Sequence, residues 1–258
     1  MSIITITSDF GTSDPYLAVI KGQLLSQLNT VQIIDISNNI DKFNIPQAAY
    51  IIKNSFTSFP SNTVHLALIG AYHPRVDFII VKYENQYFLG QNNGLFSLVF
   101  ENLPIIAYQI TLSVPPENAS FQEKSILVQA ASHLIRGGVP EVIGEQIQGL
   151  AQMISYAPII QEDAIRTSIL YIDSYGNIIT NLTKAVFVKN NRERNIEIKF
   201  RSSRVSIHKI SSHYSNVDEG SLVALFNNSG YLEIAFNSGN AAQLLGLAIT
   251  DTISIKFS

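Results

Sequence analysis

A change of pattern near the middle of the chain limits the fold more than any other feature. Up to about residue 157, short apolar runs such as 3–7 and 31–36 alternate with segments of helical spacing such as 16–28. Beyond Pro158 the chain contains short strand-like runs separated by turns of Gly, Asn and Ser. Alternating strands and helices are typical of one class of domain, and a succession of short strands is typical of another. The sequence therefore predicts two domains, residues 1–157 and 165–258.

The first domain is predicted to be α/β, with a mainly parallel sheet covered by helices on both faces. Further strands are expected at 63–69 and 78–83, and further helices at 46–56 and 125–136. The second domain is predicted to be all-β and barrel-like. Its strands are expected at 168–172, 178–182, 196–200, 222–226, 231–236 and 252–257.

Charge and residue content exclude several kinds of function. A net charge of −3 offers no basic field for a phosphate backbone, so nucleic acid is not an expected partner. The absence of cysteine excludes disulfides, thiolate catalysis and Cys-ligated zinc. The five histidines do not pair at metal-ligand spacing, so no metal site is predicted.

The sequence also gives no sign of a membrane or secretory protein. The first residues, MSIITITSDF, lack a basic segment followed by a long apolar stretch. No apolar run approaches the roughly 18 residues that a spanning helix needs. We therefore expect a cytoplasmic protein with no membrane partner.

Two turns carry acidic side chains suited to ligand binding. Asp9 follows a strand and precedes a helix, where it can accept hydrogen bonds from a vicinal diol or cap the helix. Asp173 and Asn177 lie in a turn between two strands, where they can bind a ligand or simply form a hairpin turn. Spacing alone leaves both alternatives open.

Five segments, in this order, carry a resemblance to a known family: residues 4–16 (ITITSDFGTSDPY), 31–37 (VQIIDIS), 90–95 (GQNNGL), 173–181 (DSYGNIITN) and 228–235 (NSGYLEIA), followed by the small-polar cluster 237–242. They resemble the motifs of the S-adenosylmethionine hydroxide adenosyltransferase family, which includes S-adenosylmethionine hydrolases and the related fluorinases and chlorinases. The resemblance extends over essentially the whole chain.

The resemblance implies a homotrimer whose sites form between one subunit's N-terminal domain and a neighbour's C-terminal domain. It implies that the ligand is an adenosyl compound and that no cofactor is needed besides S-adenosylmethionine as substrate. Asp9 is similar to the ligand of the ribose diol, and Phe43 to an aromatic wall of the ribose pocket. The remaining binding residues implied by the resemblance are Asp173, Asn177, Ser229, Glu233 and the backbone around Ala241.

The chain departs from the family where hydrolytic members carry an Asp-Arg-His set. Gly70 stands at the Asp position and Gln122 at the His position, while Arg75 matches the Arg if its loop is shorter. Gln122 cannot act as a base, and Gly70 has no group with which to orient water. His73, three residues after Gly70, is a hypothetical substitute.

Two hypotheses follow from this division. In the first, the protein is an enzyme that cleaves S-adenosylmethionine by attack of water or halide at C5′, with Arg75 as the retained catalytic residue. In the second, it binds an adenosyl ligand without catalysis. A purely structural oligomer would leave Asp9, Asp173 and Asn177 unexplained.

Overall fold

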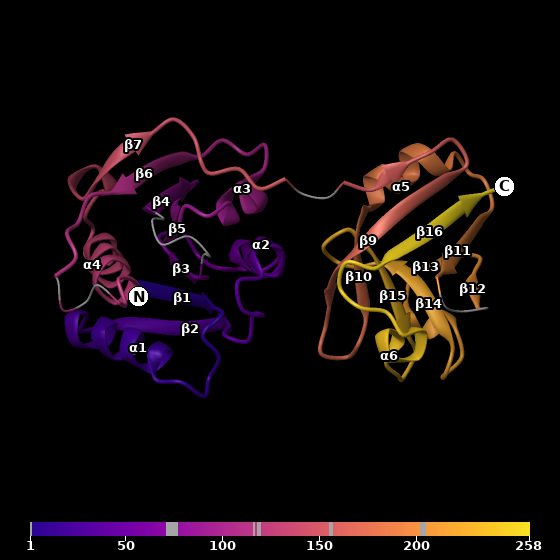
Figure 1. Cartoon of the computed structure of the whole chain (residues 1–258), viewed down its shortest axis with the longest axis horizontal. Coiled ribbons are helices and arrows are strands. Elements are labelled where there is room, and N and C mark those ends of the chain that lie inside the picture. The colour runs from indigo at the N-terminus through magenta and orange to yellow at the C-terminus, as the bar shows by residue number, and fades with distance from the viewer. Residues whose placement is uncertain (1, 71–76, 116, 118–119, 155–156, 202–204) are drawn as a thin grey trace. The chain divides into compact units, whose positions relative to one another are not determined.

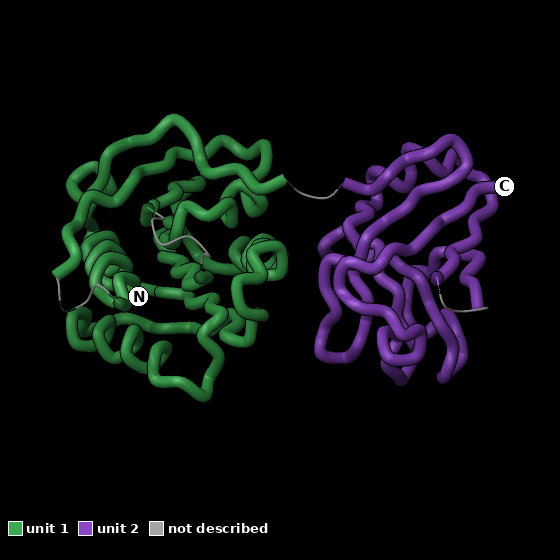
Figure 2. The backbone as a smooth tube through the Cα atoms, viewed as in Figure 1, with its two compact units in different colours: residues 1–154 green, residues 155–258 purple. Residues whose placement is uncertain are grey.

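The computed structural model describes residues 2–70, 77–115, 117, 120–154, 157–201 and 205–258. The chain forms two compact units, Met1–Ile154 and Ser155–Ser258 (Figures 1 and 2). Each unit has its own buried apolar core.

Unit 1 combines one seven-stranded sheet with four α-helices among its described residues. In chain order these are β1 Ser2–Ser8, α1 Tyr16–Gln27, β2 Val31–Ser37, α2 Ile45–Lys53, β3 Val64–Leu68, β4 Phe78–Tyr83, β5 Gln86–Gln91, α3 Leu95–Phe100, β6 Ile106–Ile110, α4 Glu123–Ile135 and β7 Gly144–Ile147.

The sheet of unit 1 is mixed, which corrects the prediction of a mainly parallel sheet. Its strand order is β2-β1-β3-β5-β4-β6-β7, with parallel pairing up to β5 and antiparallel pairing beyond it. The cause is a tight hairpin between β4 and β5, where Glu84 adopts a φ of 51°. Strand β5, which the sequence analysis did not identify, returns beside β3 and leaves β4 antiparallel to it.

Helices cover both faces of this sheet because its central strands are apolar on both sides. Leu66 and Leu68 of β3 pack into a core with residues of α1 and α4. Ala67 and the following Ile69 point the other way, into a core with residues of α2 and α3. Because β2, β1, β3 and β5 are parallel, their carboxyl ends meet at one edge of the sheet, where side chains can gather around a ligand.

In its described residues, unit 2 is a curled β-sheet with two short α-helices. Its elements are β8 Ile159–Ile160, β9 Ala164–Ile172, β10 Ile178–Thr183, α5 Lys184–Asn191, β11 Ile196–Phe200, β12 Ser206–Ile207, β13 Ile210–Ser211, β14 Leu222–Phe226, β15 Tyr231–Phe236, α6 Ala241–Leu245 and β16 Thr252–Phe257. The strand order is β12-β11-β16-β9-β10-β15-β14-β13, and β8 pairs with β9.

The curl follows from chain connectivity. The two ends of the sheet, β12 and β13, are separated in sequence only by His208 and Lys209, so the sheet must bend until its edges approach. The predicted barrel-like form is thus present as a curled half-barrel, while α5 and α6 correct the all-β prediction. Within the described parts of both units, no helix has the length and apolar character needed to cross a membrane.

Candidate functional site

Asp9 is a buried carboxylate at the carboxyl end of β1. Only 4% of the residue is exposed, and its N–H donates to the Leu68 carbonyl of β3 (3.2 Å). Its Oδ2 accepts hydrogen bonds from the backbone N–H groups of Phe43 (2.9 Å) and Gly70 (3.1 Å). Helix α1 begins later, at Tyr16, with Pro15 as its N-cap. The helix-capping alternative for Asp9 is therefore wrong.

The bonding of Asp9 leaves part of the carboxylate available. A carboxylate presents about four acceptor sites on two oxygens, and both described bonds reach Oδ2. Among the described residues, none donates a hydrogen bond to Oδ1. A hydroxyl pair of a ligand is a suitable donor, because a buried charge needs hydrogen bonds to offset its lost hydration.

Phe43 is held in an unusual conformation next to this carboxylate. Its φ is 62°, a left-handed backbone that is costly for a bulky residue, yet 40% of the residue is exposed. Core packing therefore does not explain the conformation. The hydrogen bond to Asp9 does, and strain held in place by specific bonds is typical of binding sites.

Residues on either side of Phe43 fix the loop that carries it. The ammonium of Lys42 donates to the backbone carbonyl of Asp9. Asn44 caps α2 by accepting from the N–H of Gln47 (3.1 Å). Both bonds restrain the 42–44 segment against the end of β1. The role of Lys42 was missed by sequence reasoning, and its position directly before Phe43 was the available signal.

The neighbouring strand ends are also tied together. Ser8 Oγ donates to Asn38 Oδ1 beyond β2 (2.7 Å), and Gly11 N–H donates to the Asn38 carbonyl (2.8 Å). Asn93 Nδ2 donates to the carbonyl of Ile69, just before Gly70 (3.2 Å). The segment 90–95, which is one of those that resemble the family's motifs, thus supports the end of β3.

An aromatic group brings the segment around Gln122 to this edge. The rings of Phe10, Tyr16 and Phe121 contact one another with centroids 5.5–5.8 Å apart. Phe10 follows Asp9, and Gln122 at the N-cap of α4 follows Phe121. The group was not predicted from sequence. His73 and Arg75 lie outside the described residues.

In unit 2, Asp173 organises its own turn. Its Oδ1 accepts from the N–H groups of Tyr175 and Asn177 (both 2.9 Å), and its Oδ2 accepts from Asn177 Nδ2 (3.0 Å). This is the hairpin-turn bonding that the sequence analysis left open. The half-buried carboxylate retains further acceptor capacity, so the turn also presents a fixed negative charge.

The cluster around Ala241 packs directly on that turn. Gly176 has a φ of 82°, and a Cβ added there would lie 2.1 Å from Asn240 Cγ. The Ala242 N–H donates to the Gly176 carbonyl (3.0 Å), and Asn240 caps α6, in which Ala241 is fully buried. Tertiary structure therefore brings Asp173, Asn177 and the Ala241 backbone together.

Ser229 and Glu233 lie elsewhere on the same sheet. Ser229 is in the turn before β15, whereas the Ala241 cluster follows the other end of β15, roughly 20 Å away at the usual rise of a strand. Glu233, 4% exposed, accepts hydrogen bonds from the Tyr214 hydroxyl (2.5 Å) and from Asn227 Nδ2 (3.2 Å). Within this unit, Glu233 therefore ties Tyr214 and Asn227 to strand β15.

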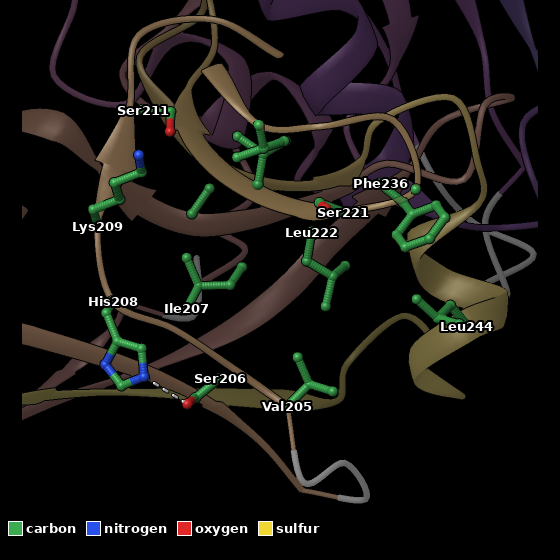
Figure 3. Close-up of a pocket in the computed structure, with 14 residues that line it drawn as sticks. Val205, Ser206, Ile207, His208, Lys209, Ser211, Ser221, Leu222, Phe236 and Leu244 are labelled. Atoms are coloured by element: carbon green, nitrogen blue, oxygen red, sulfur yellow. Dashed lines mark hydrogen bonds between the residues drawn. The ribbon is translucent and has the colours of Figure 1, made fainter. Parts of the chain in front are cut away.

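A cavity of about 550 Å³ in unit 2 contains none of the predicted site residues. Figure 3 shows its lining: Leu222, Phe236 and Leu244 on one side and the His208–Lys209 segment on the other. Its polar members include Ser206, which is hydrogen-bonded to His208 (3.0 Å). Because none of the described residues that line it carries a carboxylate, the edge around Asp9 is the better candidate for binding a diol. Among the described residues, no three metal-ligating side chains cluster.

Comparison with known proteins identifies the class to which this fold and site belong. The chain belongs to the SAM hydroxide adenosyltransferase family, whose N-terminal domain model matches residues 4–144 and whose C-terminal domain model matches residues 167–254.

Particular relatives resemble the chain over nearly its whole length. An (R)-S-adenosyl-L-methionine hydrolase of Methanocaldococcus jannaschii is 31% identical, covering 100% of this chain and 97% of that protein. A fluorinase of Actinopolyspora mzabensis is 23% identical, covering 93% and 92%. A structure of an uncharacterized conserved protein from Thermotoga maritima has the same fold, with a TM-score of 0.87 at 24% identity over 99% of this chain and 100% of that one.

Proposed function

We propose that this protein cleaves S-adenosyl-L-methionine with water, giving adenosine and L-methionine. The observation that carries the proposal is the Asp9 carboxylate, held at Oδ2 by two backbone N–H groups beside the exposed ring of Phe43. A ribose diol is the ligand group that suits it. The hydrolase names of relatives such as that of Methanocaldococcus jannaschii favour cleavage over binding alone.

The chemistry asks little of the protein beyond positioning. Water attacks C5′, the C5′–S bond breaks, and methionine leaves as a neutral thioether, with one proton released from the water. The sulfonium is already an activated leaving group, so alignment and desolvation of the nucleophile supply most of the acceleration. In this scheme Asp9 holds the ribose and Phe43 packs against the sugar.

The other predicted site residues take their roles from the family resemblance. We propose that Arg75 orients the nucleophile and that His73 contributes near it. We propose that Asp173, Asn177, Ser229, Glu233 and the Ala241 backbone bind the amino-acid and adenosine parts. Substitution of Arg75 by Lys, which retains charge but not the planar fork, tests its orienting role through kcat.

The decisive experiment follows adenosine and methionine by chromatography during incubation with S-adenosylmethionine. We expect equal amounts of both products, with loss of turnover and of adenosine binding in Asp9→Asn. Saturable binding without turnover, with water or with any halide, would establish the non-catalytic alternative instead. Absence of both binding and turnover would refute an adenosyl site altogether.

We also propose a homotrimer with sites shared between subunits. Light scattering tests the trimer, and subunit mixing tests the sharing. Asp9→Asn and Asp173→Asn should each be inactive alone. Co-refolded mixtures should recover part of the activity, because some sites then combine two unaltered halves. Mixtures as inactive as the separate variants would contradict shared sites.

We further propose that turnover requires no metal or cofactor, because the sulfonium substrate brings its own activation. Full activity after dialysis against EDTA is the expected result. We propose a cytoplasmic location, consistent with the absence of a spanning helix among the described residues. Cell fractionation tests it.

A further inference from the structure

The ring of Phe43 lies against the backbone of Gly70. A Cβ added at Gly70 would be 2.8 Å from Phe43 Cε1, 3.0 Å from Phe43 Cδ1 and 3.5 Å from Asp9 Oδ2. Non-bonded carbon atoms are most stable about 3.5–4.0 Å apart. Even an alanine at position 70 is therefore incompatible with the observed position of the ring.

The ring, and not the backbone, would have to yield. The Phe43 N–H is bound to Asp9, and the Phe43 carbonyl accepts from the N–H of Ile45 (3.0 Å). Gly70 is held in turn, because its own N–H donates to the same Asp9 oxygen. With both backbones fixed on one carboxylate, added bulk at position 70 acts directly on the Phe43 side chain.

We propose that Gly70 is a positioning residue that sets the place of the Phe43 ring in the nucleoside site. The missing side chain at the end of β3 creates the space in which the ring lies beside the Asp9 carboxylate. The ligand is a nucleoside whose diol reaches Asp9 while an apolar face of the sugar meets the ring. This inference rests on the proposed function and deepens it.

The absence of a side chain at position 70 leaves room for the Phe43 ring. A carboxylate introduced there would compete with the aromatic ring for the same space. Gly70→Asp alone is thus expected to displace Phe43 and weaken nucleoside binding. Added bulk at position 70 therefore requires the side chain at position 43 to move or to become smaller, whereas Phe43 can be shortened without a clash at Gly70.

The test is a double-mutant cycle read by calorimetry with adenosine. We expect Gly70→Ala and Phe43→Ala each to weaken adenosine binding about tenfold. The two substitutions should not be additive, as is usual for residues in contact. In the Phe43→Ala background, Gly70→Ala should cost nothing further. In turnover of S-adenosylmethionine, Gly70→Ala should raise KM more than it lowers kcat. Gly149→Ala is the matched control, because a Cβ there meets nothing within 4 Å.

Urea unfolding without ligand is measured for wild type, Gly70→Ala, Phe43→Ala and the double variant. This measurement separates the positioning role of Gly70 from the proposed function. Gly70→Ala should lower the unfolding midpoint in the wild-type background but not in Phe43→Ala. If wild type binds no adenosine, the proposed function fails and with it the nucleoside role of Gly70. If Gly70→Ala has no effect on adenosine affinity, or the same effect in both backgrounds, the positioning role is refuted even though wild type binds.

Discussion

At the scale of single residues, the protonation of His65 is strongly coupled to the fold. It is 3% exposed, its ring stacks on Phe88 with centroids 4.5 Å apart, and its Nδ1 is hydrogen-bonded to Thr5 Oγ1 (2.7 Å). Burial lowers the pKa of His65 to about 4 from its ordinary value of 6.5. The native protein therefore keeps a neutral imidazole where the unfolded chain binds a proton.

The first prediction concerns pH. Because the unfolded state binds the extra proton, burial of neutral His65 does not lower the free energy of unfolding above pH 6.5. As the pH falls from 6.5 toward 4, it lowers that free energy progressively. The loss amounts to about 3 kcal/mol of unfolding free energy. Urea unfolding at pH 7 and near pH 4 should show a smaller difference for His65→Gln than for wild type. An unchanged pH dependence in the variant would show that His65 is not the linked group.

The second prediction concerns Gly176, which touches Asn240. Gly176→Ala and Gly230→Ala both place alanine at positive φ, 82° and 77°, but only the first meets another side chain within 4 Å. We expect Gly230→Ala to cost about 1 kcal/mol from strain alone. Gly176→Ala should cost about 1–3 kcal/mol more, from the steric conflict. Urea unfolding measures both, and equal costs would argue against tight packing of the two turns.

At the scale of elements, the start of α2 matters because it carries the loop around Asp9. Asn44 ends the segment that contains Lys42 and Phe43, and its side chain accepts from the N–H of Gln47. Removing that acceptor leaves an orphan donor in the first turn. The helix cap thereby contributes both to stability and to the placement of Phe43.

The third prediction tests this cap. Asn44→Ala should lower the unfolding free energy by about 1 kcal/mol, whereas Asn44→Asp, which also accepts the N–H, should retain most of it. Adenosine affinity should follow the same order, because the cap restrains Phe43. If Asn44→Asp were as damaging as Asn44→Ala, the amide would have a role other than capping.

At the scale of the whole molecule, the two units have separate cores. Most of the buried apolar residues of unit 2 pack with one another in one cluster, which includes Ile165, Ile198, Leu232 and Ile253, and a second, smaller cluster contains Val223, Leu225 and Ala235. The cores of unit 1 lie on the two faces of its mixed sheet. A unit with its own core is expected to fold by itself.

The fourth prediction follows from these cores. A fragment comprising Ser155–Ser258 should give a β-type circular dichroism spectrum and a single cooperative unfolding transition in urea. Its affinity for adenosine should be far below that of the whole protein, because the fragment lacks Asp9 and Phe43. A fragment that unfolds gradually, without a transition, would show that unit 2 depends on the rest of the chain.

Local pattern alone determined most of the elements and the chemical character of the candidate residues. The strands at 3–7 and 78–83 and the helices at 16–28 and 125–136 match β1, β4, α1 and α4 closely, because the side-chain period of an element is encoded in neighbouring residues. The local pattern does not predict strand β5, because polar residues at its ends hide the apolar run, and it therefore predicts a mainly parallel sheet. The order of motifs was sufficient to indicate the family.

Only the tertiary structure decided which groups meet. The Asp9 carboxylate is joined to Phe43, 34 residues away, and to Gly70, 61 residues away. The sequence marked Gly70 as a missing carboxylate, and the fold gives it a neighbour, the Phe43 ring. The physical reason is that periodicity reports which face of an element is apolar, whereas hydrogen bonds and contacts between distant segments depend on how the strands are ordered in the sheet.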